Sequence, residues 1–176
     1  MSPKADTNSH TAFFYGTLMA SEVFYTVCFL TDQPPPAVTE AYTFRPAILH
    51  GYCRRRVRYA DYPGIIEDPE HVVRGTVVTG LTDANMAKLD YFEGSEYERR
   101  RVKVRVLSKV GNDKGEGNEE SDEEVTAEVY VIKDAACLEN REWDFEEFRR
   151  EKMRNWTREG YVFDGCDPND PATVVS

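Results

Sequence analysis

The sequence predicts one globular domain in which an antiparallel sheet is combined with a few short helices. The chain has 176 residues and is 40% hydrophobic, which is enough for one sizeable core but too short for two ordinary domains. Segments 101–106 and 125–131 alternate between apolar and polar residues, which is typical of half-buried strands. Segments 21–30 and 84–92 instead have the composition and spacing of helices packed on a core.

The first predicted strand covers Ala12 to Tyr15 and ends in a turn at Gly16. The helix over 21–30 follows, and the three prolines at 34–36 end it. Four short runs rich in β-branched and aromatic residues come next, separated by glycine and proline. These runs, which predict a meandering antiparallel sheet, are 47–52, 56–59, 65–66 and 75–79.

The second half of the chain adds two strands and one more helix. Glu128 in the second alternating segment is expected to face the basic side of the first. Between these segments, residues 111–124 carry −6 of the net charge of −10 and contain no apolar residue, so we expect a disordered, dispensable loop without chemistry. Asp144 begins the last helix, which Phe145, Phe148 and Trp156 are expected to seat on the sheet.

The predicted domain covers 12–160, between a disordered tail at 1–11 and a C-terminal tail at 161–176. No apolar run is long enough to span a membrane and the N-terminus lacks a hydrophobic signal segment, so we expect a soluble protein of the cytoplasm or nucleus. Nothing in the chain predicts its oligomeric state.

Charge and motif content exclude several classes of function. A pI of about 4.9 opposes nucleic-acid and membrane binding, and the basic clusters 54–58 and 99–101 are interpreted as solvated strand faces. The four cysteines form no C-x-x-C pair and the three histidines share no metal-ligand spacing. Phosphate-binding glycine motifs, the hydrolase G-x-S-x-G motif and the zinc-protease motif H-E-x-x-H are all missing from the sequence.

Glu93 is the first candidate for chemistry. Met86, Leu89 and Glu93 follow one another at helical intervals, which places a carboxylate on the apolar face of the helix that ends at Gly94. Burial raises the pKa of a carboxyl group, so such a residue can accept and return a proton near neutral pH. From spacing alone, an outward-facing Glu93, or one paired with an arginine of the 99–101 cluster, is the favoured interpretation.

The turn Tyr15-Gly16-Thr17-Leu18 is the second candidate. A strand that leads directly into a helix exposes backbone N–H groups, which bind anions such as carboxylates. We expect the N–H of Thr17 to matter more than its side chain, and Gly16→Val to abolish ligand binding because Gly16 has no Cβ to obstruct a ligand. The alternative is an ordinary strand-to-helix turn, in which Gly16→Val would mainly lower stability.

Taken together, the order of these features resembles the γ-glutamylcyclotransferase-like superfamily, and within it the AIG2-like proteins of plants and fungi. The resemblance extends over about residues 12–157. It is carried by Phe14–Leu18, Pro46–Tyr52, Tyr62–Ile65, Val73–Val77, Leu89–Gly94 with Tyr97–Arg99, and Trp143–Phe148.

The resemblance implies an α+β fold around a small, mostly antiparallel β-barrel. It also implies that Glu93 is the acid-base group, and that the substrate-binding residues are Tyr15, Gly16, Thr17, Leu18, Met19, Ala20 and Tyr97. The implied reaction releases 5-oxoproline from a γ-glutamyl substrate without a metal or organic cofactor. Two alternatives stay open, namely a non-catalytic binding or stress-response module and an acyl-transfer enzyme acting on a γ-glutamylated metabolite.

Overall fold

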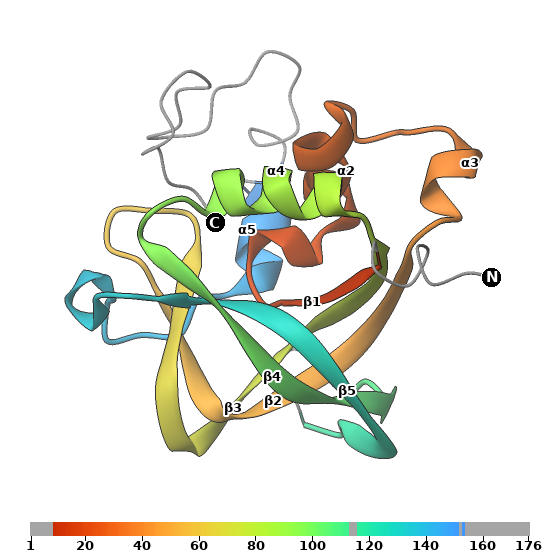
Figure 1. Cartoon of the computed structure of the whole chain (residues 1–176). Coiled ribbons are helices and arrows are strands. Elements are labelled where there is room, and N and C mark those ends of the chain that lie inside the picture. Colours follow the sequence, from red (N-terminus) through yellow and green to blue (C-terminus); the bar gives the residue numbers. More distant parts are fainter. Residues whose placement is uncertain (1–8, 113–115, 152, 154–176) are drawn as a thin grey trace.

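The computed structural model describes residues 9–112, 116–151 and 153, and Figure 1 shows their arrangement. The strands within this part of the chain are β1 (His10–Phe14), β2 (Thr43–Arg56), β3 (Pro63–Leu81), β4 (Tyr97–Lys109) and β5 (Glu119–Ile132). Its helices are η1 (Thr17–Met19), α2 (Ser21–Phe29), α3 (Pro36–Thr39), α4 (Asp83–Glu93), η2 (Ala135–Cys137) and α5 (Phe145–Glu151). None of these helices has the length and apolar character required to cross a membrane.

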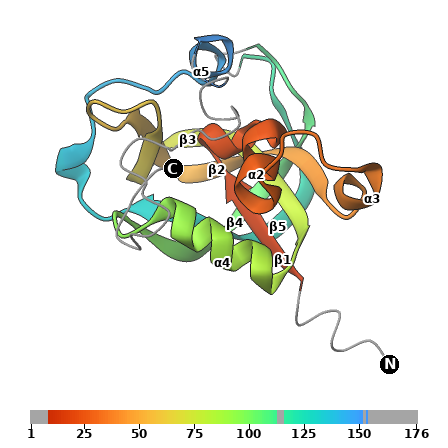
Figure 2. The same ribbon diagram turned by 90° about the horizontal axis from the view of Figure 1, so that it is seen from above.

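The strands close on themselves in the order β1-β3-β2-β4-β5. All neighbouring pairs are antiparallel except β1 and β5, which meet in parallel where Ala12 lies opposite Glu128. Helices α2, α4 and α5 lie at one end of this ring, on the side of β1 (Figures 1 and 2). The predicted α+β fold with a mostly antiparallel barrel is therefore confirmed.

The predicted meander over 43–79 is wrong in its division into short strands. Instead, β2 and β3 are two long strands that pair along most of their length. Their register shifts between His50 and Tyr52, and Gly51 there has a φ of 87°, a conformation that glycine adopts without steric cost. Gly51 thus marks an irregularity within a continuous strand, whereas Pro63 and Gly64 stand where β3 begins.

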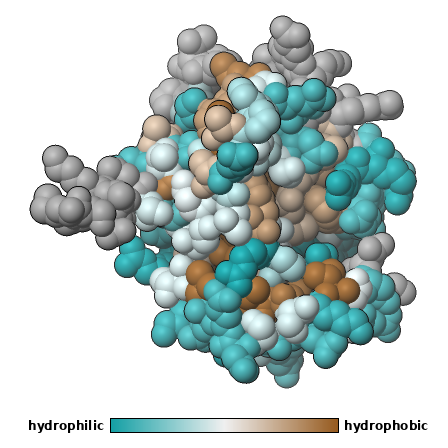
Figure 3. Space-filling view, turned by 90° about the vertical axis from the view of Figure 1, so that its right-hand side faces the viewer, coloured by the Kyte–Doolittle hydropathy of each residue, from teal (hydrophilic) through white to brown (hydrophobic). Residues whose placement is uncertain are grey.

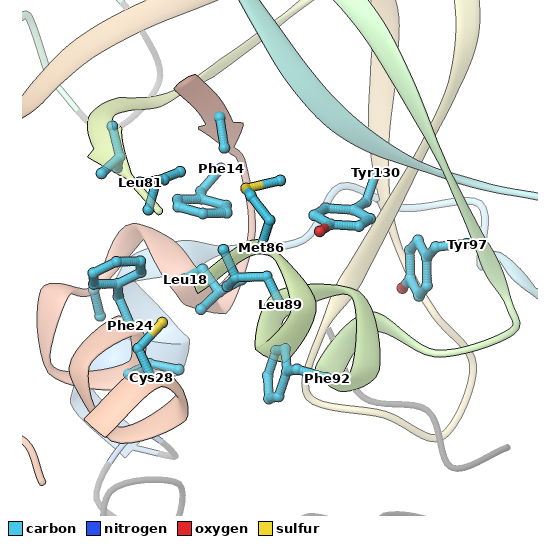
Figure 4. Packing of buried hydrophobic residues seen from close by; sticks show 14 of the residues in the cluster. Phe14, Leu18, Phe24, Cys28, Leu81, Met86, Leu89, Phe92, Tyr97 and Tyr130 are labelled. Carbon is cyan, nitrogen blue, oxygen red and sulfur yellow. The ribbon is translucent and has the colours of Figure 1, made fainter. Parts of the chain in front are cut away.

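Two hydrophobic clusters lie on either side of β1, because successive side chains of a strand point to opposite faces. Phe13 and Tyr15 belong to the cluster inside the barrel. Ala12 and Phe14 belong to the cluster under the helices. In the second cluster, side chains of α4 point toward Phe14 and Leu18 from the first part of the chain (Figure 4).

Helix α4 forms where the sequence predicts it. The Thr82 hydroxyl accepts a hydrogen bond from the N–H of Asn85, and the Asn85 side chain accepts one from the N–H of Thr82. At the other end, Gly94 has a φ of 76° and its N–H donates to the Asp90 carbonyl. These two caps fix Glu93 as the last residue of the helix.

Strand β1 and helix α5 stand at the two ends of the predicted domain. Strand β1 begins at His10, which pairs with Leu81, so the predicted tail at 1–11 is too long; residues 1–8 lie outside the described residues. At the other end, Asp144 caps α5 through the N–H groups of Glu146 and Glu147. Trp156 and the tail at 161–176 lie outside the described part of the chain.

The predicted disordered loop at 111–124 is wrong for its second half, because 119–124 is the first part of β5. The acidic residues there face basic partners. Glu124 lies 3.6 Å from Arg105 and 3.9 Å from Lys103 on β4, and Glu123 accepts a hydrogen bond of 2.9 Å from Arg45 on β2. Hydrophilic residues border the lower end of the molecule in Figure 3, as expected for charged strand residues. Cross-strand pairing therefore offsets the repulsion that the composition suggested.

We now expect the two halves of this segment to respond differently to replacement. Exchanging 119–124 for glycine and serine should lower the melting temperature by several degrees, because it removes the ladder with β4 and the ion pairs. A shorter turn in place of 112–118 should change it little, since longer loops add little closure entropy. Thermal unfolding of both variants checks this, and equal melting temperatures would contradict the pairing described above.

Candidate functional site

The turn after β1 and the end of α4 meet at a small cavity. Its wall consists of residues from the first strand and turn, one glutamate of α4 and one tyrosine of β5. These residues are Phe13, Phe14, Tyr15, Gly16, Thr17, Leu18, Glu93 and Tyr130. The volume open to the centre of a water molecule is about 10 Å³, which is room for about one water.

Glu93 is the carboxylate in this wall, and it is only 3% exposed. The outward-facing alternative is therefore wrong. The arginines that the sequence offered as partners pair with other carboxylates: Arg99 with Asp90 at 3.3 Å, Arg101 with Glu128 at 3.5 Å, and Arg100 with Glu98. Because Leu89 is fully buried on the same helix face, the spacing that predicted an inward Glu93 is confirmed.

Two tyrosines share the cavity wall with Glu93. Tyr15 donates a hydrogen bond of 2.7 Å to the Tyr130 carbonyl, and Tyr130 donates one of 2.7 Å to Asp90. Burial raises the pKa of both hydroxyls well above their ordinary value, and the negative charge of Glu93 raises it further. Both tyrosines are therefore neutral hydrogen-bond donors at any working pH, and Glu93 is the one carboxylate among the described residues of this wall.

The second half of the turn Tyr15 to Leu18 belongs to the short helix η1. The N–H of Met19 donates to the Gly16 carbonyl at 2.9 Å, and that of Ala20 donates to the Thr17 carbonyl at 3.1 Å. The N–H groups of Thr17 and Leu18 precede these bonds and have no partner within the helix. The Thr17 side chain is fully buried, and its hydroxyl has no hydrogen-bond partner among the described residues.

Gly16 is required for packing. A Cβ atom on Gly16 would stand 2.9 Å from Cδ and 3.0 Å from Cγ of Pro63, closer than real contacts allow. The space beside Gly16 is thus occupied by a proline ring, which supports the structural explanation of this glycine. Binding of a ligand by the backbone at Gly16 stays a prediction.

We therefore expect Gly16→Ala to lower the free energy of unfolding by about 1–3 kcal/mol, the usual cost of overpacking. Pro63→Ala in the same chain should recover part of this loss, because it removes the ring that the new methyl group meets. Urea unfolding of the parent, both single variants and the double variant measures this coupling. Strictly additive losses would show that the contact with Pro63 does not explain Gly16.

The cavity brings together only part of the predicted site. Tyr15, Gly16, Thr17, Leu18 and Glu93 share its wall. By contrast, Met19 lines separate pockets of about 340 Å³ and 450 Å³, and Ala20 lines the second of these. Tyr97 is buried nearby and donates a hydrogen bond of 2.9 Å to the Pro63 carbonyl.

Two functional candidates escaped the sequence analysis. Tyr130 lies within an alternating strand, and nothing local distinguishes it from a core tyrosine. Arg54 was assigned to a solvated face, yet its side chain is only 12% exposed. The strand alternation gives no signal for Arg54, because Cys53 and Val57 are buried on the opposite face of the strand.

The cysteines and histidines considered in the sequence analysis do not line this cavity where the structure describes them. Within the described residues, no group of three or more His, Cys, Asp or Glu side chains could hold a metal ion. Cys28 and Cys53 are buried free thiols, as expected, and burial raises the pKa of Cys28 to about 12. The described histidines pair with nearby acids outside the cavity.

Comparison with known proteins places the chain among related sequences. The family model described as "Gamma-glutamyl cyclotransferase, AIG2-like" matches residues 12–157. Protein AIG2 C of Arabidopsis thaliana is 33% identical over 147 residues, which cover 82% of this chain and 75% of that protein. Protein AIG2 B of the same plant is 34% identical and covers 82% of this chain and 73% of its own length.

Solved structures give the same result. The solution structure of At3g28950.1 from Arabidopsis thaliana matches with a TM-score of 0.51 at 33% identity, covering 80% of this chain and 73% of that one. A structure titled "Gamma-glutamyl cyclotransferase" matches with a TM-score of 0.50 at 18% identity, covering 70% of this chain and 66% of the other. The second match shows similarity of fold.

Proposed function

Because the chain belongs to the γ-glutamyl cyclotransferase, AIG2-like family, we propose that it releases 5-oxoproline from a γ-glutamyl amine or γ-glutamyl amino acid. The observation that carries this proposal is Glu93, a carboxylate buried in the wall of a cavity that it shares with the turn Tyr15 to Leu18. Buried carboxylates are costly to a fold and are typical of sites that transfer protons.

The proposed reaction is an intramolecular aminolysis. Glu93 accepts a proton from the α-ammonium group of the substrate, and the freed amine attacks the γ-carbonyl carbon to close a five-membered ring. The bond between that carbon and the leaving nitrogen then breaks as Glu93 returns the proton to this nitrogen. The ring nitrogen loses its second proton, again through Glu93, and the released amine takes it up to become an ammonium group. The products are 5-oxoproline and the released amine or amino acid, and no metal or organic cofactor takes part.

The backbone of the turn is proposed to hold the negative charge of the substrate. The N–H groups at the start of η1 would donate to its α-carboxylate or to the oxyanion that develops on the γ-carbonyl oxygen. Since Tyr15 and Tyr130 are neutral donors already bonded to acceptors, they maintain the wall and leave proton transfer to Glu93.

Substrate entry requires this wall to move. The cavity holds about one water molecule, and a γ-glutamyl group is several times larger. Leu18 lines the cavity on the side of the turn and is packed in the cluster under the helices. A shift of η1 would enlarge the cavity without disturbing the barrel ladder.

The test is to incubate the purified protein with a panel of γ-glutamyl amines and γ-glutamyl amino acids and to follow 5-oxoproline by mass spectrometry. Release of 5-oxoproline from one class supports the proposal and identifies the leaving group. Saturable binding without any product would instead indicate a binding module, and a new γ-glutamyl conjugate without 5-oxoproline would indicate acyl transfer.

A further inference from the structure

We infer that Arg54 is a positioning residue that fixes the direction of the peptide between Tyr15 and Gly16. This inference rests on the proposed function for its catalytic consequence, but the contact itself does not. Arg54 lies on β2, outside the cavity wall, and is bonded to the turn that forms that wall. It touches no part of the cavity and acts through the backbone of the turn.

The guanidinium group of Arg54 is held at both of its ends. Its Nη1 donates to the Tyr15 carbonyl at 2.8 Å and to the Arg74 carbonyl at 3.2 Å. Its Nη2 donates to Glu142 at 3.0 Å, and its Cζ lies 5.5 Å from the ring centre of Trp143. A planar, forked donor between such partners has little freedom to turn.

Keeping this group buried is costly, because burial lowers the pKa of Arg54 and the neighbouring Arg74 lowers it further. Glu142 opposes both effects. A neutral side chain would avoid this cost, so the site retains a cation against a penalty. The hydrogen bond to the Tyr15 carbonyl is the contact that would explain, in the proposed reaction, why a cation is kept buried here despite its desolvation cost.

The consequence for the turn follows from peptide geometry. In a trans peptide the C=O and N–H groups point in opposite directions, and the peptide that joins Tyr15 to Gly16 is trans. Arg54 attracts the Tyr15 carbonyl to the outer side of the turn. The N–H of Gly16 is thereby directed away from Arg54, and Gly16 forms part of the cavity wall.

The same bond also polarises the peptide. A cation at the carbonyl oxygen strengthens the partial positive charge on the N–H, which makes it a better donor to a carboxylate or an oxyanion. Arg54 would thus preorganise one donor of the anion-binding turn before substrate arrives.

Spectroscopy tests the contact without any substrate. In ¹⁵N-labelled protein, Arg54→Met should move the Gly16 amide nitrogen resonance upfield, because the preceding carbonyl loses its hydrogen bond. Arg54→Lys, which can reach one carbonyl but not all three partners, should give an intermediate position. Arg55→Met is the matched control, since Arg55 is the next residue of β2 and contacts Asn140 instead. An unchanged Gly16 resonance in Arg54→Met would overturn the inference.

Kinetics then tests the catalytic consequence. If the parent releases 5-oxoproline, Arg54→Met should lower kcat about tenfold or more, with a smaller change in KM, and Arg54→Lys should recover part of the loss. Equal losses of kcat in Arg54→Met and Arg55→Met, or a loss that only follows melting temperature, would show a structural role and overturn the positioning role. If the parent releases no 5-oxoproline, the proposed function fails while the Gly16 resonance still decides whether Arg54 fixes the peptide.

Discussion

Glu93→Gln is expected to lower kcat for 5-oxoproline release by a hundredfold or more, the usual loss when a general acid-base group is removed. Glutamine keeps the shape of the side chain at the end of α4, but its amide cannot accept the α-ammonium proton. The helix caps at Thr82 and Gly94 do not involve this side chain, so the fold should persist. Turnover and melting temperature of the variant, measured together, check the expectation.

Two further variants sharpen this test. Glu93→Asp keeps the carboxyl group but shortens the side chain by one methylene group. The kcat of this variant should therefore fall between those of the parent and Glu93→Gln. Glu98→Gln is the matched control, because Glu98 lies just beyond the helix, is exposed and pairs with Arg100. Near-normal turnover in Glu93→Gln would exclude the proposed mechanism, whatever the other variants do.

The features that the sequence predicts well are local. Helix α4 has its caps and its apolar spacing within a dozen residues, so Glu93 can be placed on the buried face without knowledge of the rest of the chain. Strands β4 and β5 can also be predicted locally, because the alternation of apolar and polar residues lies within each strand. The pairing of Arg101 with Glu128 follows from this alternation.

The features that the sequence misses depend on distant partners. Arg54 is buried because the Tyr15 carbonyl and Glu142, at positions 39 and 88 residues away, converge on it. The acidic segment was misjudged for the same reason, since its charge was counted without Arg45 and Arg105 across the sheet. Composition reports how many charges a segment has, and only the strand register determines which partners neutralise them.

Thr17→Val is expected to change stability and binding in opposite directions, because the buried, unpaired hydroxyl revises the expectation that the side chain of Thr17 matters less than its N–H. Valine has nearly the same shape as threonine but lacks the hydroxyl, which is buried without a hydrogen-bond partner among the described residues. Removing an unsatisfied buried polar group should raise the free energy of unfolding by about 1 kcal/mol, or the melting temperature by about 2–4 °C.

Binding of a non-cleavable γ-glutamyl analogue should weaken in the same variant by roughly tenfold or more, because a hydrogen bond from the Thr17 hydroxyl to a carboxylate contributes about 1.5–3 kcal/mol. Thr17→Ser keeps the hydroxyl and the N–H of the turn, so it should bind nearly as the parent does. Calorimetric titration and thermal unfolding of the three proteins separate the possible roles. Parental affinity in Thr17→Val would exclude the hydroxyl as a ligand of the substrate, whereas a loss of both affinity and stability would show that it supports the fold. If the unpaired hydroxyl of Thr17 binds the substrate, the Thr17→Val variant should be more stable than the parent and should bind the analogue less tightly.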